Sequence, residues 1–124
     1  MGKRFAILIC VAAAGVMALG AVASAGVVKY DTQVTVTKDR GGFYHGSVKS
    51  EVRKCMEGRR VVLFKRRPGA DRKLGAVRSQ WENRGEGSWG VILDRNEGTR
   101  VYAQVRRKVR DRFVCRFDRS AFRR

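Results

Sequence analysis

The chain has 124 residues, with 28 Lys and Arg against 11 Asp and Glu, and a formal net charge of +17 at pH 7. This length is enough for one domain and too short for two. The excess of positive charge favours anionic partners but says nothing about the fold, and a single histidine leaves little material for acid–base or metal chemistry.

The first 25 residues have the pattern of a secretory signal peptide. A basic pair, Lys3-Arg4, precedes an uncharged apolar run from Phe5 to Val22, and the triplet Ala23-Ser24-Ala25 offers a small-x-small cleavage site. The alternative is a retained membrane anchor, because an apolar run of about 18 residues is just long enough to span a bilayer. We predict a cleaved signal peptide over 1–25 and one domain over 26–124, secreted or held at the cell envelope.

Cysteine usage fits an exported protein. Cys10 lies inside the apolar run, which leaves Cys55 and Cys115 in the exported domain. Two cysteines in such a domain favour a disulfide, and with one histidine they are too few ligands for a metal site. Closing a loop of about 60 residues would stabilise the fold by roughly 4 kcal/mol in the chain-entropy description. Two free thiols are the alternative; neither metal nor cofactor is expected.

Seven short strands are predicted in chain order, separated by turn signals and without a helical period. They are Gln33–Thr37, Phe43–Ser50, Arg60–Lys65, Leu74–Ser79, Trp89–Leu93, Thr99–Arg106 and Phe113–Asp118. Short strands at such regular spacing predict an all-β fold, a single seven-stranded antiparallel β-sandwich. Residues 26–31 have little to bury, and residues 80–88 are expected to form a polar loop that contains Trp81.

Three of these strands carry detailed expectations. Arg60–Lys65 is apolar on both faces at its centre, which is typical of a strand in the middle of a sheet. Thr99–Arg106 alternates cleanly, so its Val and Ala side chains should point inward. Gly46 interrupts Phe43–Ser50 and should admit a close neighbour, and Trp89 should anchor the core.

The order of these features carries a resemblance. The features are Phe43-Tyr44-His45-Gly46-Ser47-Val48, Cys55, Arg60-Val61-Val62-Leu63-Phe64, Gly75, Gly87-Ser88-Trp89, Tyr102-Ala103-Gln104-Val105 and Cys115. Over about residues 40–120 the chain resembles the small prealbumin-like (Ig-like) domains related to carboxypeptidase regulatory domains, as found in secreted bacterial proteins with two cysteines. The resemblance implies a seven-stranded sandwich without an active site, often displayed outside the cell. The chain departs from it in the longer segment between Ser79 and Gly87.

No catalytic constellation is visible in the sequence, so no enzyme activity is expected. His45 could act as a base or ligand, but an ordinary half-buried strand residue explains it as well, and no nucleophile motif accompanies it. Asp94, Asn96 and Glu97 lack the spacing of a calcium loop and fit a turn with local backbone hydrogen bonds. Trp81 could stack on a base or sugar or could cover an edge of the fold.

Clustered basic residues are the most informative feature for function. Arginine at loop tips can grip phosphates or sulfates in bidentate geometry, whereas the alternative is a solvated charged surface. The candidate anion-binding residues are Arg106, Arg107, Lys108, Arg110 and Arg112, with Lys65, Arg66 and Arg67 as a second group.

These observations predict an exported, non-enzymatic structural or binding module at the cell envelope. Its cationic surface would adsorb to anionic polymers such as cell-wall phosphates, acidic polysaccharides or lipid headgroups. The alternative is a secreted cationic effector, meaning an antimicrobial or nucleic-acid-binding protein, although no dedicated nucleic-acid motif is present.

Overall fold

The structure is a computed structural model that describes residues 26–121. The predicted signal peptide, residues 1–25, therefore lies outside the described residues. Between 26 and 121 the chain is all β, with twelve strands in three sheets and one 3₁₀ turn, Arg53–Cys55. No helix in this part of the chain is long and apolar enough to cross a membrane.

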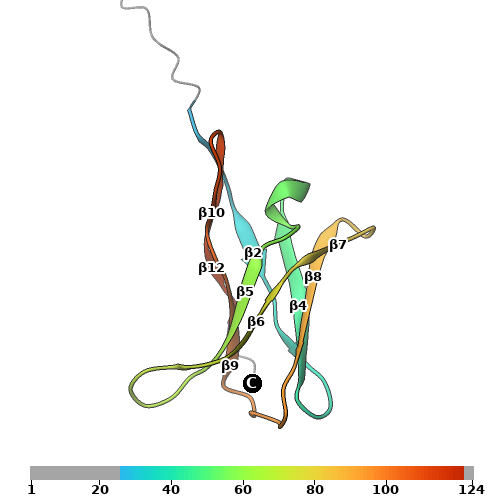
Figure 1. Cartoon of the computed structure of the whole chain (residues 1–124), viewed down its shortest axis with the longest axis vertical. Helices are drawn as coiled ribbons and strands as arrows, with labels where there is room; N and C mark the ends of the chain where they lie inside the picture. The colour runs from blue at the N-terminus through green and yellow to red at the C-terminus, as the bar shows by residue number, and fades with distance from the viewer. Residues whose placement is uncertain (1–25, 122–124) are drawn as a thin grey trace, which may run out of the picture.

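Two larger sheets form the body of the molecule, and a smaller one lies at one end (Figure 1). The five-stranded sheet has β2 (Thr32–Val34), β4 (Phe43–Ser50), β8 (Glu86–Ile92) and β7 (Gln80–Glu82) in that order, with β3 (Thr37–Lys38) also paired to β4. The four-stranded sheet has the order β12 (Asp118–Arg119), β9 (Val101–Val105), β5 (Arg60–Lys65), β6 (Arg72–Arg78). The three-stranded sheet is β1 (Val28–Tyr30), β11 (Phe113–Cys115), β10 (Lys108–Val109), and its β1–β11 pair is parallel.

One hydrophobic core joins the two larger sheets. Alternate residues of a strand point to one face, so the inward positions of both sheets meet between them. The buried residues of this core are Val34, Tyr44, Val48 and Trp89 from the five-stranded sheet, and Val61, Leu63, Val101, Ala103 and Val105 from the four-stranded sheet. The predicted inward register of Thr99–Arg106, the central place of Arg60–Lys65 and the core position of Trp89 are confirmed.

Gly46 allows a close approach between two parts of the chain, as predicted. A Cβ atom at this position would collide with the carbonyl oxygen of Thr35 and would lie 3.0 Å from Nε1 of Trp89. The Thr35 N–H donates to the Ser47 carbonyl at 3.0 Å, which holds the two segments together. A side chain at 46 would therefore separate segments that the core requires to be in contact.

The predicted seven strands were too few and the predicted loop at 80–88 was wrong. This segment is a hairpin of β7 and β8, whose turn uses Gly85 at φ 85°. Trp81 lies on β7, half-buried, with the Arg53 guanidinium 4.8 Å from its ring centre. Strands of two or three residues are too short to show an alternation of polar and apolar residues. They form because they pair with neighbouring strands, so the sequence pattern does not reveal them.

The last predicted strand is also divided. Residues 113–118 supply β11 to the three-stranded sheet and the first residue of β12 to the four-stranded sheet. Phe117 lies between the two strands and is 49 % exposed. The chain crosses from one sheet to another here, so a single period cannot describe both segments.

Candidate anion-binding site

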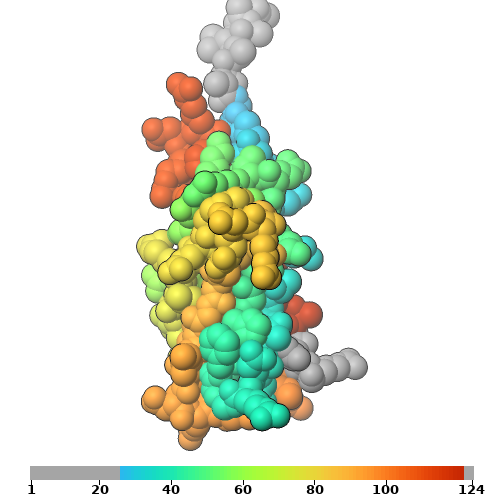
Figure 2. Space-filling view, turned by 90° about the vertical axis from the view of Figure 1, so that its right-hand side faces the viewer, coloured from blue at the N-terminus to red at the C-terminus, as the bar shows by residue number. Residues whose placement is uncertain are grey.

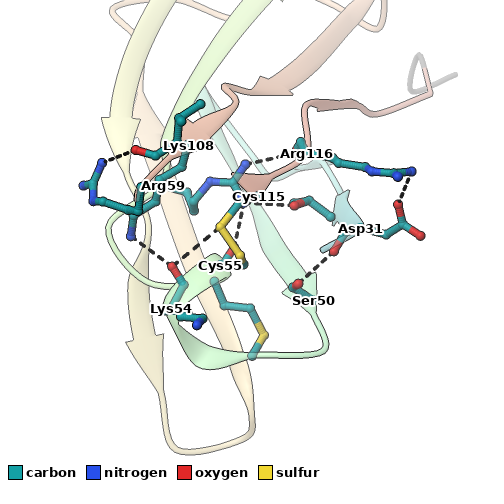
Figure 3. The surroundings of a disulfide bond; sticks show 12 residues. Asp31, Ser50, Lys54, Cys55, Arg59, Lys108, Cys115 and Arg116 are labelled. Carbon is teal, nitrogen blue, oxygen red and sulfur yellow. Dashed lines mark hydrogen bonds and ion pairs between the residues drawn. A yellow bond between two sulfur atoms is a disulfide. The ribbon is translucent and has the colours of Figure 1, made fainter. Parts of the chain in front are cut away.

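The site lies at the corner of the molecule that carries the disulfide. Cys55 and Cys115 are bonded, both are fully buried, and their Cα atoms are 5.4 Å apart (Figure 3). The bond joins the end of the 3₁₀ turn to the end of β11, and the predicted pairing is confirmed. The three-stranded sheet is thereby fixed against the body of the molecule.

Arg59 is a fully buried cation beside this disulfide. Its Nη1 donates to Thr32 Oγ1 at 2.9 Å and to the Cys55 carbonyl at 2.8 Å. Its Nη2 donates to the carbonyls of Arg106 at 2.8 Å and Arg116 at 3.0 Å. All four acceptors are neutral oxygens, and the remaining donor, Nε, has no partner among the described residues.

Burial has a measurable consequence for this guanidinium. Removal of the charge from water lowers the pKa of Arg59 to about 10, because the charged form is the one that water stabilises most. Arg59 therefore keeps its positive charge at neutral pH. The corner holds a buried charge whose hydrogen bonds are almost complete and whose charge is not balanced by a carboxylate.

Three further arginines stand at neighbouring strand ends in front of this corner. Arg60 begins β5 and lies directly opposite Arg78, the last residue of β6. On the other side of β5, the Arg106 N–H donates to the Arg60 carbonyl at 2.9 Å. Like charges in directly opposed positions destabilise a sheet. Within residues 26–121 no carboxylate lies within ion-pair distance of these three guanidiniums.

These residues surround a small cavity that we call the basic hollow. Its volume is about 270 Å³, and it is lined by Gly58, Arg59, Arg60, Arg78, Arg106, Arg107, Lys108, Val109 and Arg110. Seven of the nine lining residues are cations and none is an acid. In Figure 2 the segment that contains β10, coloured orange-red, stands out from the body beside the green 3₁₀ region.

The pKa of Lys108 reflects how closely the positive charges of the hollow lie to one another. Burial lowers the pKa of its ammonium, and the positive charges of Arg110, Arg59 and Arg78 lower it further, against a smaller opposite effect of Glu57. Its Nζ donates to the carbonyl of Lys54 at 2.9 Å (Figure 3). The cations around Lys108 therefore repel its charge, and an anion bound among them would relieve that repulsion.

The structure separates the two predicted groups of basic residues. Arg106, Arg107, Lys108 and Arg110 line the basic hollow, and Arg112 lines a neighbouring hollow of about 470 Å³ with Lys54, Arg110, Asp111 and Phe113. Lys65 is at the other end of β5, roughly 17 Å from Arg60 at 3.4 Å per residue. Arg66 and Arg67 follow it in the turn between β5 and β6 (Figure 1).

Part of that second group lies beside acids. Lys65 pairs with Glu97 at 3.2 Å, together with Arg72 at 2.6 Å and Arg95 at 3.1 Å. Asp71 accepts hydrogen bonds from the Tyr102 hydroxyl and from the Arg67 N–H. The excess positive charge is consequently better exposed to a ligand at the basic hollow than at this end.

Sequence reasoning missed Arg59, Arg60 and Arg78 as members of the site. Arg60 and Arg78 are 18 positions apart and meet only because β5 and β6 pair in this register. Arg59 precedes a buried strand and looked like an ordinary solvated end of it. The pairing of those two predicted strands was the one signal that could have brought Arg60 and Arg78 together.

The single histidine lies beside a different, polar hollow. His45 Nε2 lies 2.8 Å from Asp39 Oδ2, and its ring stacks on Phe43 at 5.0 Å. It borders an open polar hollow of about 480 Å³ in which Ser47 Oγ bonds to Thr35 Oγ1 at 2.9 Å. Across residues 26–121 there is no group of three or more His, Cys, Asp or Glu arranged to hold a metal ion.

No family model, no curated protein and no solved structure matches this chain. The resemblance to prealbumin-like domains stays a prediction that rests on the residues quoted for it. Function has to be argued from the basic hollow itself.

Proposed function

We propose that this protein is an exported, non-enzymatic binding module that attaches to anionic polymers of the cell envelope through its basic hollow. The observation that carries the proposal is the lining of that hollow, which has seven cations and no acid, whereas Lys65 in the second predicted group pairs with Glu97. Cell-wall phosphates, acidic polysaccharides and lipid headgroups are the polymers and surfaces concerned.

The chemistry of arginine supports this use. Its planar guanidinium offers fixed pairs of donors that match the oxygens of phosphate and sulfate groups. A polyanion that reaches several of these side chains also releases its condensed counterions, and this release favours binding at moderate salt. Arg60 and Arg78 stand on rigid strands, so little conformational entropy of the backbone is lost on binding.

The proposal also includes the fold of the protein and its export from the cytoplasm. A prealbumin-like β-sandwich is supported by the common core of the two larger sheets, and the three-stranded sheet would be an addition to it. The Cys55–Cys115 bond suits an oxidising compartment. We propose that residues 1–25 are removed as a signal peptide on the way there.

The test compares two variants that carry the same change of charge. In the hollow variant Arg106, Arg107, Lys108 and Arg110 are replaced by Gln; in the control variant Arg40, Lys73, Arg84 and Arg100, all exposed and outside the hollow, are replaced by Gln. Each protein binds to immobilised polyphosphate at physiological salt. We expect the hollow variant to lose at least about tenfold in affinity and the control variant to lose less than about threefold.

Equal losses in the two variants would mean that only the net charge matters and would remove the hollow from the account. The competing function, a secreted cationic effector, makes a different prediction with the same proteins. It requires that wild-type protein permeabilise or kill cells, whereas a binding module remains on the envelope and is released by salt.

A further inference from the structure

We propose that the basic hollow is a specific pocket for a phosphate or pyrophosphate group, which supplies the counter-charge that buried Arg59 lacks among residues 26–121. This inference rests on the proposed function and narrows it from adsorption by general charge to one defined site of defined chemistry. The hollow would bind one such group per chain, and polymers or surfaces would be recognised through the phosphates they carry.

Arg59 is the first reason. A fully buried charge is normally paired with an opposite charge, because removal from water is costly. The side chain of Arg59 is 1 % exposed and donates to four neutral oxygens, which satisfies its geometry and leaves its charge unbalanced. Arg59 also lines the hollow, so its charge adds to the positive potential that an anion seated there would meet.

The arrangement of the exposed arginines is the second reason. Arg78, Arg60 and Arg106 occupy the ends of three adjacent strands, β6, β5 and β9, at matching register positions. Neighbouring strands lie about 4.8 Å apart, so the three Cα atoms span roughly 10 Å. Three guanidiniums at this spacing can surround a compact anion from one side, and Arg107, Lys108 and Arg110 complete the wall.

The size of the hollow sets the ligand class. At about 270 Å³ it lies just below the range of roughly 300–1,000 Å³ typical of small-molecule sites, which excludes a large folded ligand. A phosphate monoester carries about 1.5 to 2 negative charges and three strong acceptor oxygens in a small volume. A phosphate monoester therefore balances the clustered positive charges better than a carboxylate, which carries one negative charge.

Calorimetric titration with inorganic pyrophosphate, at physiological sodium chloride, tests the pocket directly. We expect saturable binding with one pyrophosphate per chain. Arg60→Gln with Arg78→Gln, both exposed side chains, should lower the affinity by at least about tenfold. Arg40→Gln with Arg84→Gln removes the same charge from two turns outside the hollow and should change the affinity by less than about twofold.

Several results would overturn the pocket. These are many weak sites per chain, no saturation, or equal losses of affinity in the two double variants, provided that thermal unfolding shows all proteins to be folded.

A second experiment identifies the source of the phosphate. Pyrophosphate is used to displace the bound protein from soluble poly(glycerol phosphate) and from vesicles that contain phosphatidic acid. Displacement from either supports the pocket and identifies that source, whereas protein that stays bound to both in the presence of pyrophosphate contradicts it.

The same experiments separate this inference from the proposed function. If polyphosphate retention persists while pyrophosphate does not bind, the pocket fails and adsorption by the envelope module stands. If pyrophosphate binds in the hollow but no envelope polymer is retained, the pocket stands and the envelope function fails.

Discussion

Arg59 and Glu97 are the two charged side chains with the least exposure in the described chain, and they are stabilised in opposite ways. Glu97 is 8 % exposed and receives hydrogen bonds from three cations, whereas Arg59 is 1 % exposed and donates only to neutral oxygens. A carboxylate among cations needs no ligand. A guanidinium without an anion leaves a charge that a ligand can balance.

The pairing of Glu97 predicts a pH dependence of stability. Burial alone would raise the pKa of Glu97, but the hydrogen bonds from Arg95, Lys65 and Arg72 outweigh it and lower the pKa to about 2. A carboxyl group with a depressed pKa stabilises the fold above its ordinary value of 4.5 and loses that contribution as pH falls toward 2. We therefore expect Glu97→Gln to be less stable than wild type at pH 7 and the difference to shrink between about pH 4.5 and pH 2.

Urea unfolding at a series of pH values measures this difference. Glu57→Gln is the control, because Glu57 is exposed and pairs with Arg53 at 3.0 Å in a surface arrangement that contributes little. A constant difference between Glu97→Gln and wild type across that pH range would show that the carboxylate charge is not what stabilises this end of the molecule.

At the scale of the elements, the central β4–β8 pair depends on two glycines in different ways. A Cβ at 46 would meet the backbone of Thr35, which cannot move without moving a strand. A Cβ at 90 would approach the ring of Phe43 at 3.1 Å and would make ordinary contact with the His45 Cβ at 3.7 Å, and the Phe43 side chain can shift. Gly46→Ala should therefore destabilise the protein by about 2–3 kcal/mol and Gly90→Ala by less than about 1 kcal/mol.

Denaturant unfolding of the two variants checks this difference, and the pair is well matched because Gly90 lies opposite His45, next to Gly46, in the same ladder. Equal stability losses would mean that the close approach of the Thr35 segment does not constrain the strand.

The same elements show what the sequence could and could not predict. β4, β5, β8 and β9 are long enough for their buried positions to appear as a pattern, and the sequence located each of them, although it placed the first three residues of β8 in a loop. The two-residue strands β3, β10 and β12 exist because longer strands offer them a pairing edge, so no local signal marks them. The basic hollow was half predicted: its β10 side is a run in sequence, whereas Arg60 and Arg78 meet only through strand register.

For the whole molecule, the distribution of charge matters more than its total. A net charge of +17 opposes a compact state by self-repulsion, and Glu97, Asp71 and the disulfide offset this at different places. At the basic hollow no acid lines the cavity, and none of the described carboxylates pairs with its arginines. We assign the role of counter-charge there to an anionic partner.

The dependence of binding on salt shows whether the polyanion is held in the basic hollow or by charge spread over the surface. Binding of fluorescent polyphosphate to wild type, hollow variant and control variant is titrated across a series of sodium chloride concentrations. Each phosphate contact contributes about 0.7 to the slope of log K against log salt for a flexible polyanion. Relative to wild type, we predict that the magnitude of this slope falls by roughly 3 in the hollow variant and by less than about 1 in the control variant. Parallel lines for the two variants would contradict the account, because the contacts would then be spread evenly over the surface.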